Sequence, residues 1–211
     1  MVRVLLARRC ILRSWAVLIH SNSLISELDE VRSLITDCRL CKLHKARTNP
    51  VPGEGDSAAT IMLVGEAPGR KEDELGKPFV GSAGKILDEV LVKAGIDRSK
   101  IFITNIVKCR PPDNRVPELD ETTACITNYL QRQIHIIRPR VICIMGSSAL
   151  GSLLGMKSIL VNRGKTVYRN NIPYFLTIHP AATIYNRKLR SYLEKDMTTL
   201  AKEYLVPDLM D

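Results

Sequence analysis

Two groups of cysteines lie far apart in the chain and could together hold a metal centre. Cys38 and Cys41 form a C-x-x-C pair, whereas Cys109 and Cys125 are separated from each other by fifteen residues. A zinc ribbon would normally supply a second tight pair, so this spacing favours an iron–sulfur cube. Zinc and unliganded core thiols stay open as alternatives on the cysteines alone.

The remaining two of the six cysteines are expected to be bystanders. Cys10 lies near the N-terminus, and Cys143 lies in the middle of an apolar run, where a thiol behaves as a small buried apolar residue. An intracellular C-x-x-C pair favours metal or redox chemistry over a structural disulfide. We expect a non-secreted, cytoplasmic protein.

A second set of chemically capable residues follows the ends of apolar runs. Glu66 follows the run at 60–64 and His179 follows the run at 174–178, while Asn105 closes another. A carboxylate, an amide and an imidazole can position water, read the polar edge of a ring and stabilise a developing negative charge. Taken one at a time, each also has a structural explanation, such as capping a turn.

Four apolar runs must supply the elements that position these residues. Each run is continuously apolar rather than alternating, which is typical of strands covered on both faces of a parallel sheet. Apolar residues at helical spacing lie between the runs, at 84–94 and 119–137. This order implies an α/β protein, a three-layer α/β/α sandwich around a mainly parallel four-stranded sheet. The runs are 60–64, 101–105, 141–145 and 174–178.

The predicted sheet brings the second set of residues to one edge. Ligands of such sheets bind beyond the carboxyl ends of the strands, so we expect Glu66, Asn105 and His179 to lie close together. Phe79 lies in a glycine-flanked segment and by default would be a core residue. Residues 157–173 are predicted to form a hairpin before the last strand.

The composition describes one ordinary globular domain with a surplus of positive charge. The chain has 31 Lys and Arg against 22 Asp and Glu, a formal net charge of +9, and 45% of its residues are hydrophobic. These values exclude collagen-like, disordered and small disulfide-scaffold proteins. No uninterrupted apolar stretch approaches the ~20 residues of a membrane helix, so no membrane partner is expected. The charge favours an anionic partner, and we expect a monomer.

The first 26 residues differ in composition from the rest. They contain four arginines and Trp15, and no acidic residue precedes Glu27. This composition resembles a mitochondrial transit peptide, and an N-terminal helix or an extension from an upstream start codon are the alternatives. We expect residues 1–26 to be an N-terminal extension of uncertain role and residues 27–211 to form the domain.

Four short motifs together are highly specific, although each alone is weak. They place a glycine-rich turn, an aromatic ring, an amide and an imidazole around successive strand ends. The set resembles the family-four uracil-DNA glycosylases, the iron–sulfur branch of that superfamily, over about Ser33 to Glu203. The motifs are Gly65-Glu66-Ala67-Pro68-Gly69, Gly76-Lys-Pro-Phe79-Val-Gly81-Ser-Ala-Gly84, Asn105-Ile-Val-Lys-Cys109-Arg-Pro-Pro112 and His179-Pro-Ala-Ala182.

The resemblance implies a cofactor and a base-binding site. Phe79 would stack on a flipped uracil, Asn105 would read its polar edge, and His179 would contact the uracil O2. Glu72 matches an acid that the family places near uracil C5, where it would exclude the methyl group of thymine. The implied 4Fe–4S cluster would be held by four residues that match the family's ligand positions, Cys38, Cys41, Cys109 and Cys125.

The resemblance also implies that the loop after the predicted strand at 60–64 contacts the substrate through Glu66, Ala67 and Pro68. In the best-known superfamily members an Asp stands at the position that is Ala67 here, which has no ionisable group. Glu66 is the nearest acid. It would either position or activate the water or stabilise positive charge on the sugar, so Glu66 and His179 are the candidate catalytic residues.

The implied function is a monofunctional uracil-DNA glycosylase of base excision repair. A base inside a duplex cannot be reached, so it must be extruded at a cost of a few kcal/mol, and stacking on an aromatic ring returns ~1–3 kcal/mol. Hydrolysis of the N-glycosidic bond would leave an abasic site. Strand cleavage is not expected, because no lysine is placed to form a Schiff base. The alternative is an iron–sulfur protein that binds damaged DNA or transfers electrons without glycosylase activity.

Basic residues flank the motifs in sequence and are candidates to neutralise the phosphates of uracil-containing DNA, the expected partner. They are Lys108, Arg110, Arg115, Arg187, Lys188 and Arg190.

Overall fold

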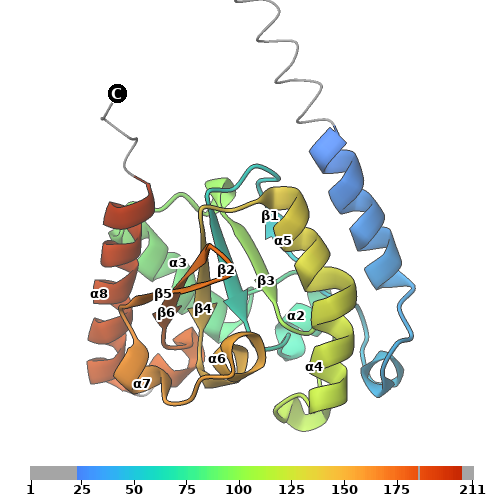
Figure 1. Cartoon of the computed structure of the whole chain (residues 1–211). Helices are drawn as coiled ribbons and strands as arrows, with labels where there is room; N and C mark the ends of the chain where they lie inside the picture. The colour runs from blue at the N-terminus through green and yellow to red at the C-terminus, as the bar shows by residue number, and fades with distance from the viewer. Residues whose placement is uncertain (1–22, 185, 206–211) are drawn as a thin grey trace, which may run out of the picture.

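The computed structural model describes residues 23–184 and 186–205, whose strands form one six-stranded sheet (Figure 1). The strand order is β1-β3-β2-β4-β6-β5. The inner four strands run parallel to one another, and both edge strands are antiparallel to their neighbours. The strands are β1 (Glu54–Gly55), β2 (Ile61–Gly65), β3 (Phe102–Asn105), β4 (Val141–Met145), β5 (Thr166–Arg169) and β6 (Ile172–Thr177).

The prediction of an α/β fold is confirmed, but the four-stranded sheet is wrong, because the sheet has six strands. The predicted strands correspond to β2, β3, β4 and β6. β1 has only two residues, too few to produce an apolar pattern. β5 is half exposed and so does not read as a buried strand. It pairs with β6 through a turn in which Asn170 and Asn171 both have positive φ.

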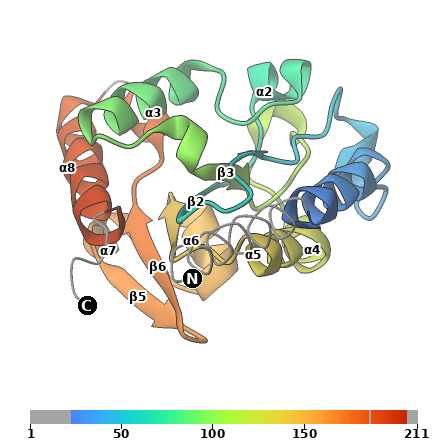
Figure 2. The ribbon, with the colours of Figure 1, turned by 90° about the horizontal axis from the view of Figure 1, so that it is seen from above.

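Helices cover both faces of the sheet (Figures 1 and 2). α3 and α8 pack together on one face, and α4 and α5 lie on the other. The predicted helix at 84–94 corresponds to α3, and the stripe at 119–137 is α4 and α5 joined by a π-helical turn, Ile126–Leu130. The labelled helices are α2 (Arg70–Leu75), α3 (Ser82–Lys93), α4 (Leu119–Cys125), α5 (Gln131–Ile137), α6 (Ser147–Leu154), α7 (Ile159–Asn162) and α8 (Arg187–Tyr204). Short 3₁₀ turns occupy Lys42–Lys45, Arg98–Lys100, Pro112–Asn114 and Pro180–Thr183.

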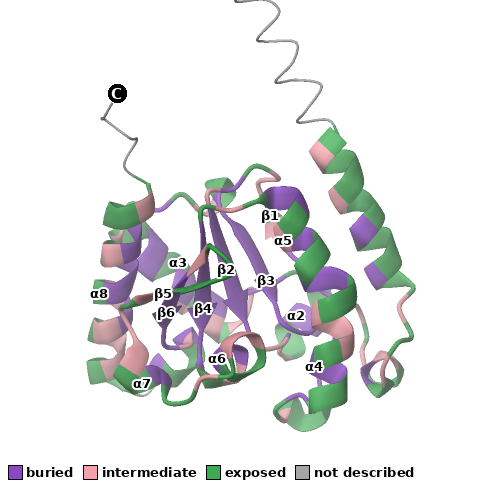
Figure 3. Cartoon of the chain, in the orientation of Figure 1, coloured by how far each residue is buried: buried purple, intermediate pink, exposed green. Residues whose placement is uncertain are grey.

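The inner strands form the core of the protein. β2, β3 and β4 are buried along their whole length (Figure 3), which explains their continuously apolar sequences. Cys143 lies in the middle of β4 and is fully buried, and this burial raises the pKa of its thiol. Among the residues that the structure describes, no helix is long and apolar enough to cross a membrane.

A helix over residues 23–36 leads the chain to the C-x-x-C pair and runs beside α5 and α4 (Figure 1). Val31 and Ile35 on this helix are fully buried and pack against Tyr129 and Ile136. The predicted boundary after residue 26 falls within the helix, and the division into extension and domain stays a prediction. Residues 1–22, with Cys10, lie outside the described residues.

Candidate active site

A pocket lies at the carboxyl ends of the parallel strands, where the sequence predicted one. It gathers residues from the loops after β2 and β6, from the end of β3 and from the segment before α3. Among its walls are four predicted contacts with the base, Glu72, Phe79, Asn105 and His179. The full lining is Ala67, Gly69, Glu72, Phe79, Ala83, Asn105, His179 and Ala181.

Two glycines make room for this packing. A Cβ atom at Gly65 would lie 2.5 Å from Asn105 Oδ1 and 2.7 Å from Phe79 Cζ, and one at Gly84 would lie 1.9 Å from the carbonyl oxygen of Phe79. No side chain fits at Gly65 without moving the ring or the amide, and none fits at Gly84 without moving the backbone of Phe79. The glycines of the motifs therefore serve the close approach of Phe79 and Asn105 to the backbone.

Phe79 is buried and adopts a left-handed backbone conformation, with φ of 51°. Such a conformation is strained for an aromatic residue and persists only where its surroundings hold it. Glu72 supplies that support, because its Oε1 accepts hydrogen bonds from the backbone N–H groups of Val80, at 2.9 Å, and Gly81, at 2.7 Å. Glu72 thus fixes the turn that presents the ring, a role that the sequence motif does not reveal. Its predicted contact near uracil C5 stays a prediction.

Asn105 is 2% exposed at the end of β3. Its Oδ1 atom has no hydrogen-bond partner among the residues that the structure describes. Leaving a buried acceptor unpaired costs about 1–3 kcal/mol, so native proteins rarely tolerate one without a reason. The side chain lines the pocket, and a ligand N–H group would satisfy it.

His179 lies against Phe79 at the other wall, with ring centroids 5.6 Å apart and an interplanar angle of 34°. Burial lowers the pKa of the imidazole to about 4, and the nearby charge of Glu72 opposes this in part. The ring is therefore neutral at pH 7. Its Nδ1 accepts a hydrogen bond from the backbone N–H of Ala181 at 3.2 Å, so the proton resides on Nε2. His179 is a neutral donor.

The lowered pKa of His179 predicts that its protonation destabilises the fold in acid. The pKa falls from the ordinary 6.5 to about 4 on folding. Between these values the unfolded chain binds a proton that the folded chain does not, so the free energy of unfolding decreases as pH falls through 6.5 and this contribution levels off below about 4. Urea unfolding of the wild type and His179→Asn across this range measures the effect. An unchanged pH dependence in the variant would contradict a buried neutral imidazole.

Glu66 lies in a neighbouring groove that shares Ala67, His179 and Ala181 with the pocket. Burial raises the pKa of its carboxyl, and a hydrogen bond with the Ser148 side chain opposes this shift. Pro68 is buried and lines neither cavity. The groove is lined by Glu66, Ala67, Val116, Met145, Gly146, Ser147, Ser148, His179, Ala181 and Ala182. The sequence does not identify Val116 and Ala83 as lining residues, because small apolar side chains have no distinctive chemistry.

The four predicted ligand cysteines surround a separate cavity, which is also lined by residues of the segment after Asn105. Cys38 and Cys41 follow the helix at 23–36, Cys109 follows β3, and Cys125 ends α4. All four are free thiols. Burial raises the pKa of Cys41 and Cys109, and that of Cys125 to about 12. The other walls are Ile35, Leu40, Leu43, Arg47, Val107, Lys108, Ala124 and Tyr129.

The four thiols that line one cavity are the donor set that either a zinc ion or an iron–sulfur cube would need. A zinc ion would draw each thiolate sulfur to about 2.3 Å from the metal. An iron–sulfur cube is larger, and each of its irons takes one thiolate, so its ligands stand farther apart around a shared cavity.

Arg47 adds a cation to the cysteine cavity. Its guanidinium donates to Cys109 Sγ at 3.1 Å and to the carbonyl oxygens of Thr36, at 2.8 Å, and Cys38, at 3.1 Å. It therefore joins the C-x-x-C segment to the loop after β3. No motif in the sequence points to this residue.

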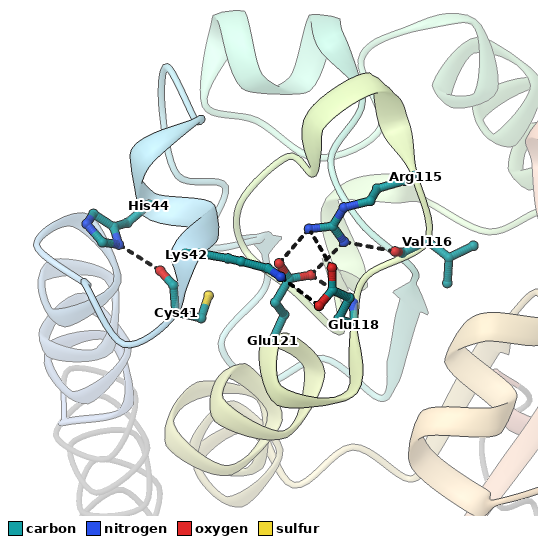
Figure 4. A network of polar contacts seen from close by, with 7 residues as sticks. All are labelled: Cys41, Lys42, His44, Arg115, Val116, Glu118 and Glu121. Carbon is teal, nitrogen blue, oxygen red and sulfur yellow. Dashed lines mark hydrogen bonds and ion pairs between the residues drawn. The ribbon is translucent and has the colours of Figure 1, made fainter.

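A network of ion pairs ties the same two segments together at the surface (Figure 4). Lys42, next to Cys41 in the chain, pairs with Glu118 at 2.6 Å. Arg115 makes two hydrogen bonds to the buried Glu121, at 2.7 and 2.9 Å, and a third to the carbonyl oxygen of Val116 at 3.0 Å. Arg115 is the member of this network that contacts Val116, which lines the groove beside Glu66.

These contacts correct part of the predicted phosphate-binding set. Lys108 cannot reach a phosphate, because it is only 1% exposed. Arg115 is engaged by two carboxylates, Glu118 and Glu121, and Arg190 by Glu89 and Glu194. Three predicted cations are at least partly exposed and form no ion pair with a carboxylate of the described residues: Arg110, Arg187 and Lys188.

An aromatic ring, an amide oxygen without a partner among the described residues and a neutral imidazole around one pocket of a doubly covered sheet are groups that could bind a flat polar ring. Comparison with known proteins narrows this class. A family model described as the uracil DNA glycosylase superfamily matches residues 52–203. The chain belongs to that superfamily.

Several relatives named type-4 uracil-DNA glycosylase resemble the chain over most of its length. The protein of Sulfurisphaera tokodaii is 45% identical over 193 residues, which cover 87% of each chain. That of Saccharolobus solfataricus is 47% identical over 82% of this chain and 84% of its own. That of Thermotoga maritima is 39% identical over 81% and 91%. The resemblance to the family-four branch, predicted from the motifs, is confirmed.

Proposed function

We propose that the chain removes uracil from DNA by hydrolysing the bond between the base and deoxyribose, leaving an abasic site. The observation that carries this proposal is the unpaired Oδ1 of Asn105 in a pocket walled by Phe79 and a neutral His179. Uracil is flat and presents an N3–H donor between two carbonyl acceptors, which complements these three groups. Superfamily membership supports the same reaction.

Binding requires the nucleotide to leave the stack. In the pocket, Phe79 stacks on the flipped base and returns ~1–3 kcal/mol of the cost of extrusion. Asn105 Oδ1 accepts from N3–H and its Nδ2 donates to O4. Cytosine carries an acceptor at N3 and a donor at C4, so both contacts would be mismatched. Glu72 holds the turn that presents Phe79 and lies beside the base.

Cleavage leaves negative charge on the uracil. His179 donates through Nε2–H to O2, where that charge develops, so its contribution is largest at the transition state. Glu66, in the groove where the sugar enters, either positions the attacking water or stabilises positive charge on the sugar. Neither cavity is lined by a lysine that could form a Schiff base, which supports a monofunctional hydrolase without strand cleavage.

Cys38, Cys41, Cys109 and Cys125 hold a 4Fe–4S cluster in this proposal. When bound, the cluster cross-links the segment after the helix at 23–36, the loop after β3 and the end of α4. Uracil-containing DNA is the partner, with Arg187 and Lys188 as exposed candidates for phosphate contacts. We further propose a monomeric intracellular enzyme whose domain spans residues 27–211.

A uracil-release assay tests the proposed function directly. The purified chain is incubated with a labelled oligonucleotide that carries one uracil, and abasic sites are detected by alkaline cleavage. A matched oligonucleotide with thymine at the same position is the control. We expect cleavage of the first only. Binding of the uracil strand without base release would favour the damaged-DNA-binding alternative, and no interaction with DNA would favour electron transfer.

Replacing Asn105 with Asp should lower discrimination between uracil and cytosine by roughly tenfold or more, since one bidentate base contact is worth about 1–3 kcal/mol. A carboxylate cannot donate to O4, whereas a protonated carboxyl can pair with the edge of cytosine. The measurement is the ratio of single-turnover release rates from oligonucleotides that carry uracil or cytosine. An unchanged ratio would show that Asn105 does not read the base.

A further inference from the structure

Lys108 is a fully buried lysine that the reaction as described does not use. It is 1% exposed, and no carboxylate of the described residues forms an ion pair with it. It stands between Asn105 and Cys109 in the chain and lines the cysteine cavity. Burying an ammonium without a counter-anion is strongly unfavourable. Its burial therefore requires both hydrogen-bond acceptors and negative charge nearby.

The side chain of Lys108 forms hydrogen bonds at the end of β3, the strand that ends with Asn105. Its Nζ donates to Thr104 Oγ1 at 2.5 Å, to the carbonyl oxygen of Asn105 at 2.8 Å and to Gln133 Oε1 at 2.8 Å. All three ammonium protons are thus used, and every acceptor is neutral. Thr104 and Gln133 in turn both donate to the carbonyl oxygen of Pro52, which fixes them. The ammonium is the centre of a rigid network at the end of β3.

Lys108 also lies beside the cysteines. It lines the cavity together with Cys125, and the next residue in the chain is Cys109. The negative charge of four thiolates exceeds the positive charge of an iron–sulfur core, so the liganded cluster is an anion. Lys108 and Arg47 are the two cations in the walls of the cavity that would hold it.

We propose that Lys108 is a positioning residue that couples the cysteine cluster to base recognition. The cluster anion balances the buried ammonium, and the ammonium holds the carbonyl group of Asn105 and hence the backbone from which the amide reaches the pocket. This inference rests on the proposed function of the pocket. It assigns the cluster an electrostatic role in base recognition besides its role as a cross-link.

The test compares Lys108→Met, which keeps an unbranched side chain one atom shorter and removes the charge, with Lys42→Met. Lys42 adjoins another ligand cysteine, but its side chain is 52% exposed, so water screens its charge. We expect Lys108→Met to slow single-turnover uracil release by roughly tenfold or more, the factor for losing a hydrogen bond from a charged donor. Its affinity for uracil-free DNA should not change. Lys42→Met should release uracil at the wild-type rate.

The reduction potential of the cluster gives a readout that a purely structural role would not move. Loss of a buried positive charge beside the cluster should shift the potential to more negative values in Lys108→Met, because the reduced, more negative cluster loses stabilisation. Lys42→Met should leave it near the wild-type value. A potential in Lys108→Met that equals that of the wild type would overturn the electrostatic coupling.

Thr104→Val keeps the proposal testable if Lys108→Met does not fold. This variant removes one acceptor of the network and keeps the cation, so uracil release should slow several-fold while the potential stays unchanged. A wild-type release rate in Lys108→Met, or in Thr104→Val if Lys108→Met does not fold, would overturn the positioning role. If the wild-type chain itself releases no uracil, the proposed function fails, and the shift in potential between wild type and Lys108→Met still decides the coupling to the cluster.

Discussion

Replacing His179 with Ala should slow cleavage of the glycosidic bond by roughly 100- to 1000-fold, the effect of losing one preorganised donor to a developing anion. The loss should appear in single-turnover rates with saturating enzyme. Binding to uracil-free DNA should stay nearly intact, because the imidazole acts on the flipped base and not on the duplex.

The local geometry explains why the effect should be large. The hydrogen bond from the Ala181 N–H group to Nδ1 fixes the tautomer, and packing against Phe79 fixes the plane of the ring. The donor is therefore oriented before the substrate arrives and needs no reorganisation during the reaction. The low pKa, about 4, also keeps the imidazole from carrying a positive charge into the buried site at neutral pH.

Glu66→Gln provides the comparison for His179→Ala. A large loss of rate in Glu66→Gln would indicate that the carboxylate activates water or stabilises the charge of the sugar, since the amide has the same shape without the charge. If His179→Ala cleaves at the wild-type single-turnover rate, the site proposed at the end of β6 is wrong. In that event Asn105 and Phe79 would bind the base without help from the imidazole.

The sequence predicted the parts of the fold that depend on burial. The four inner strands are continuously apolar because helices cover both faces. Beyond their carboxyl ends, Asn105 and His179 line one pocket, and Glu66 lines the neighbouring groove. The edge strands carry no such pattern. β1 has two residues, and β5 is half exposed, so their place in the sheet follows from pairing with neighbours rather than from composition.

Long-range hydrogen bonds account for what the sequence could not predict about the site. Glu72 lies in a run of charged residues and looks solvated, yet its carboxylate holds the turn after Phe79. Lys108 looks like a phosphate contact beside Arg110, yet it is buried by partners as distant in sequence as Gln133. Charge alone does not distinguish an exposed lysine from a buried one, because the acceptors that decide burial are contributed by other elements.

Replacing Cys109 with Ser should abolish the proposed iron–sulfur cluster and with it most of the soluble, folded protein. The thiol is 6% exposed and packs with Leu43 and Val107, and Arg47 donates to its sulfur. A serine hydroxyl is a poor ligand for iron, so three thiolates would be left around a cavity built for four. The purified wild type should be brown, with broad visible absorbance, whereas the variant should be colourless and unfold at a lower temperature.

Cys143→Ala is the matched control for Cys109→Ser. Both thiols are buried, but Cys143 lies within β4 in the core and not among the four that share the cavity. Its loss should leave the colour, the iron content and uracil release unchanged, while a small core cavity lowers stability modestly. Bleaching in Cys109→Ser alone would therefore reflect ligation rather than the loss of a buried thiol. A colourless wild type that contains stoichiometric zinc after anaerobic purification would contradict the cluster, because the four thiols would then hold one ion after contracting around it.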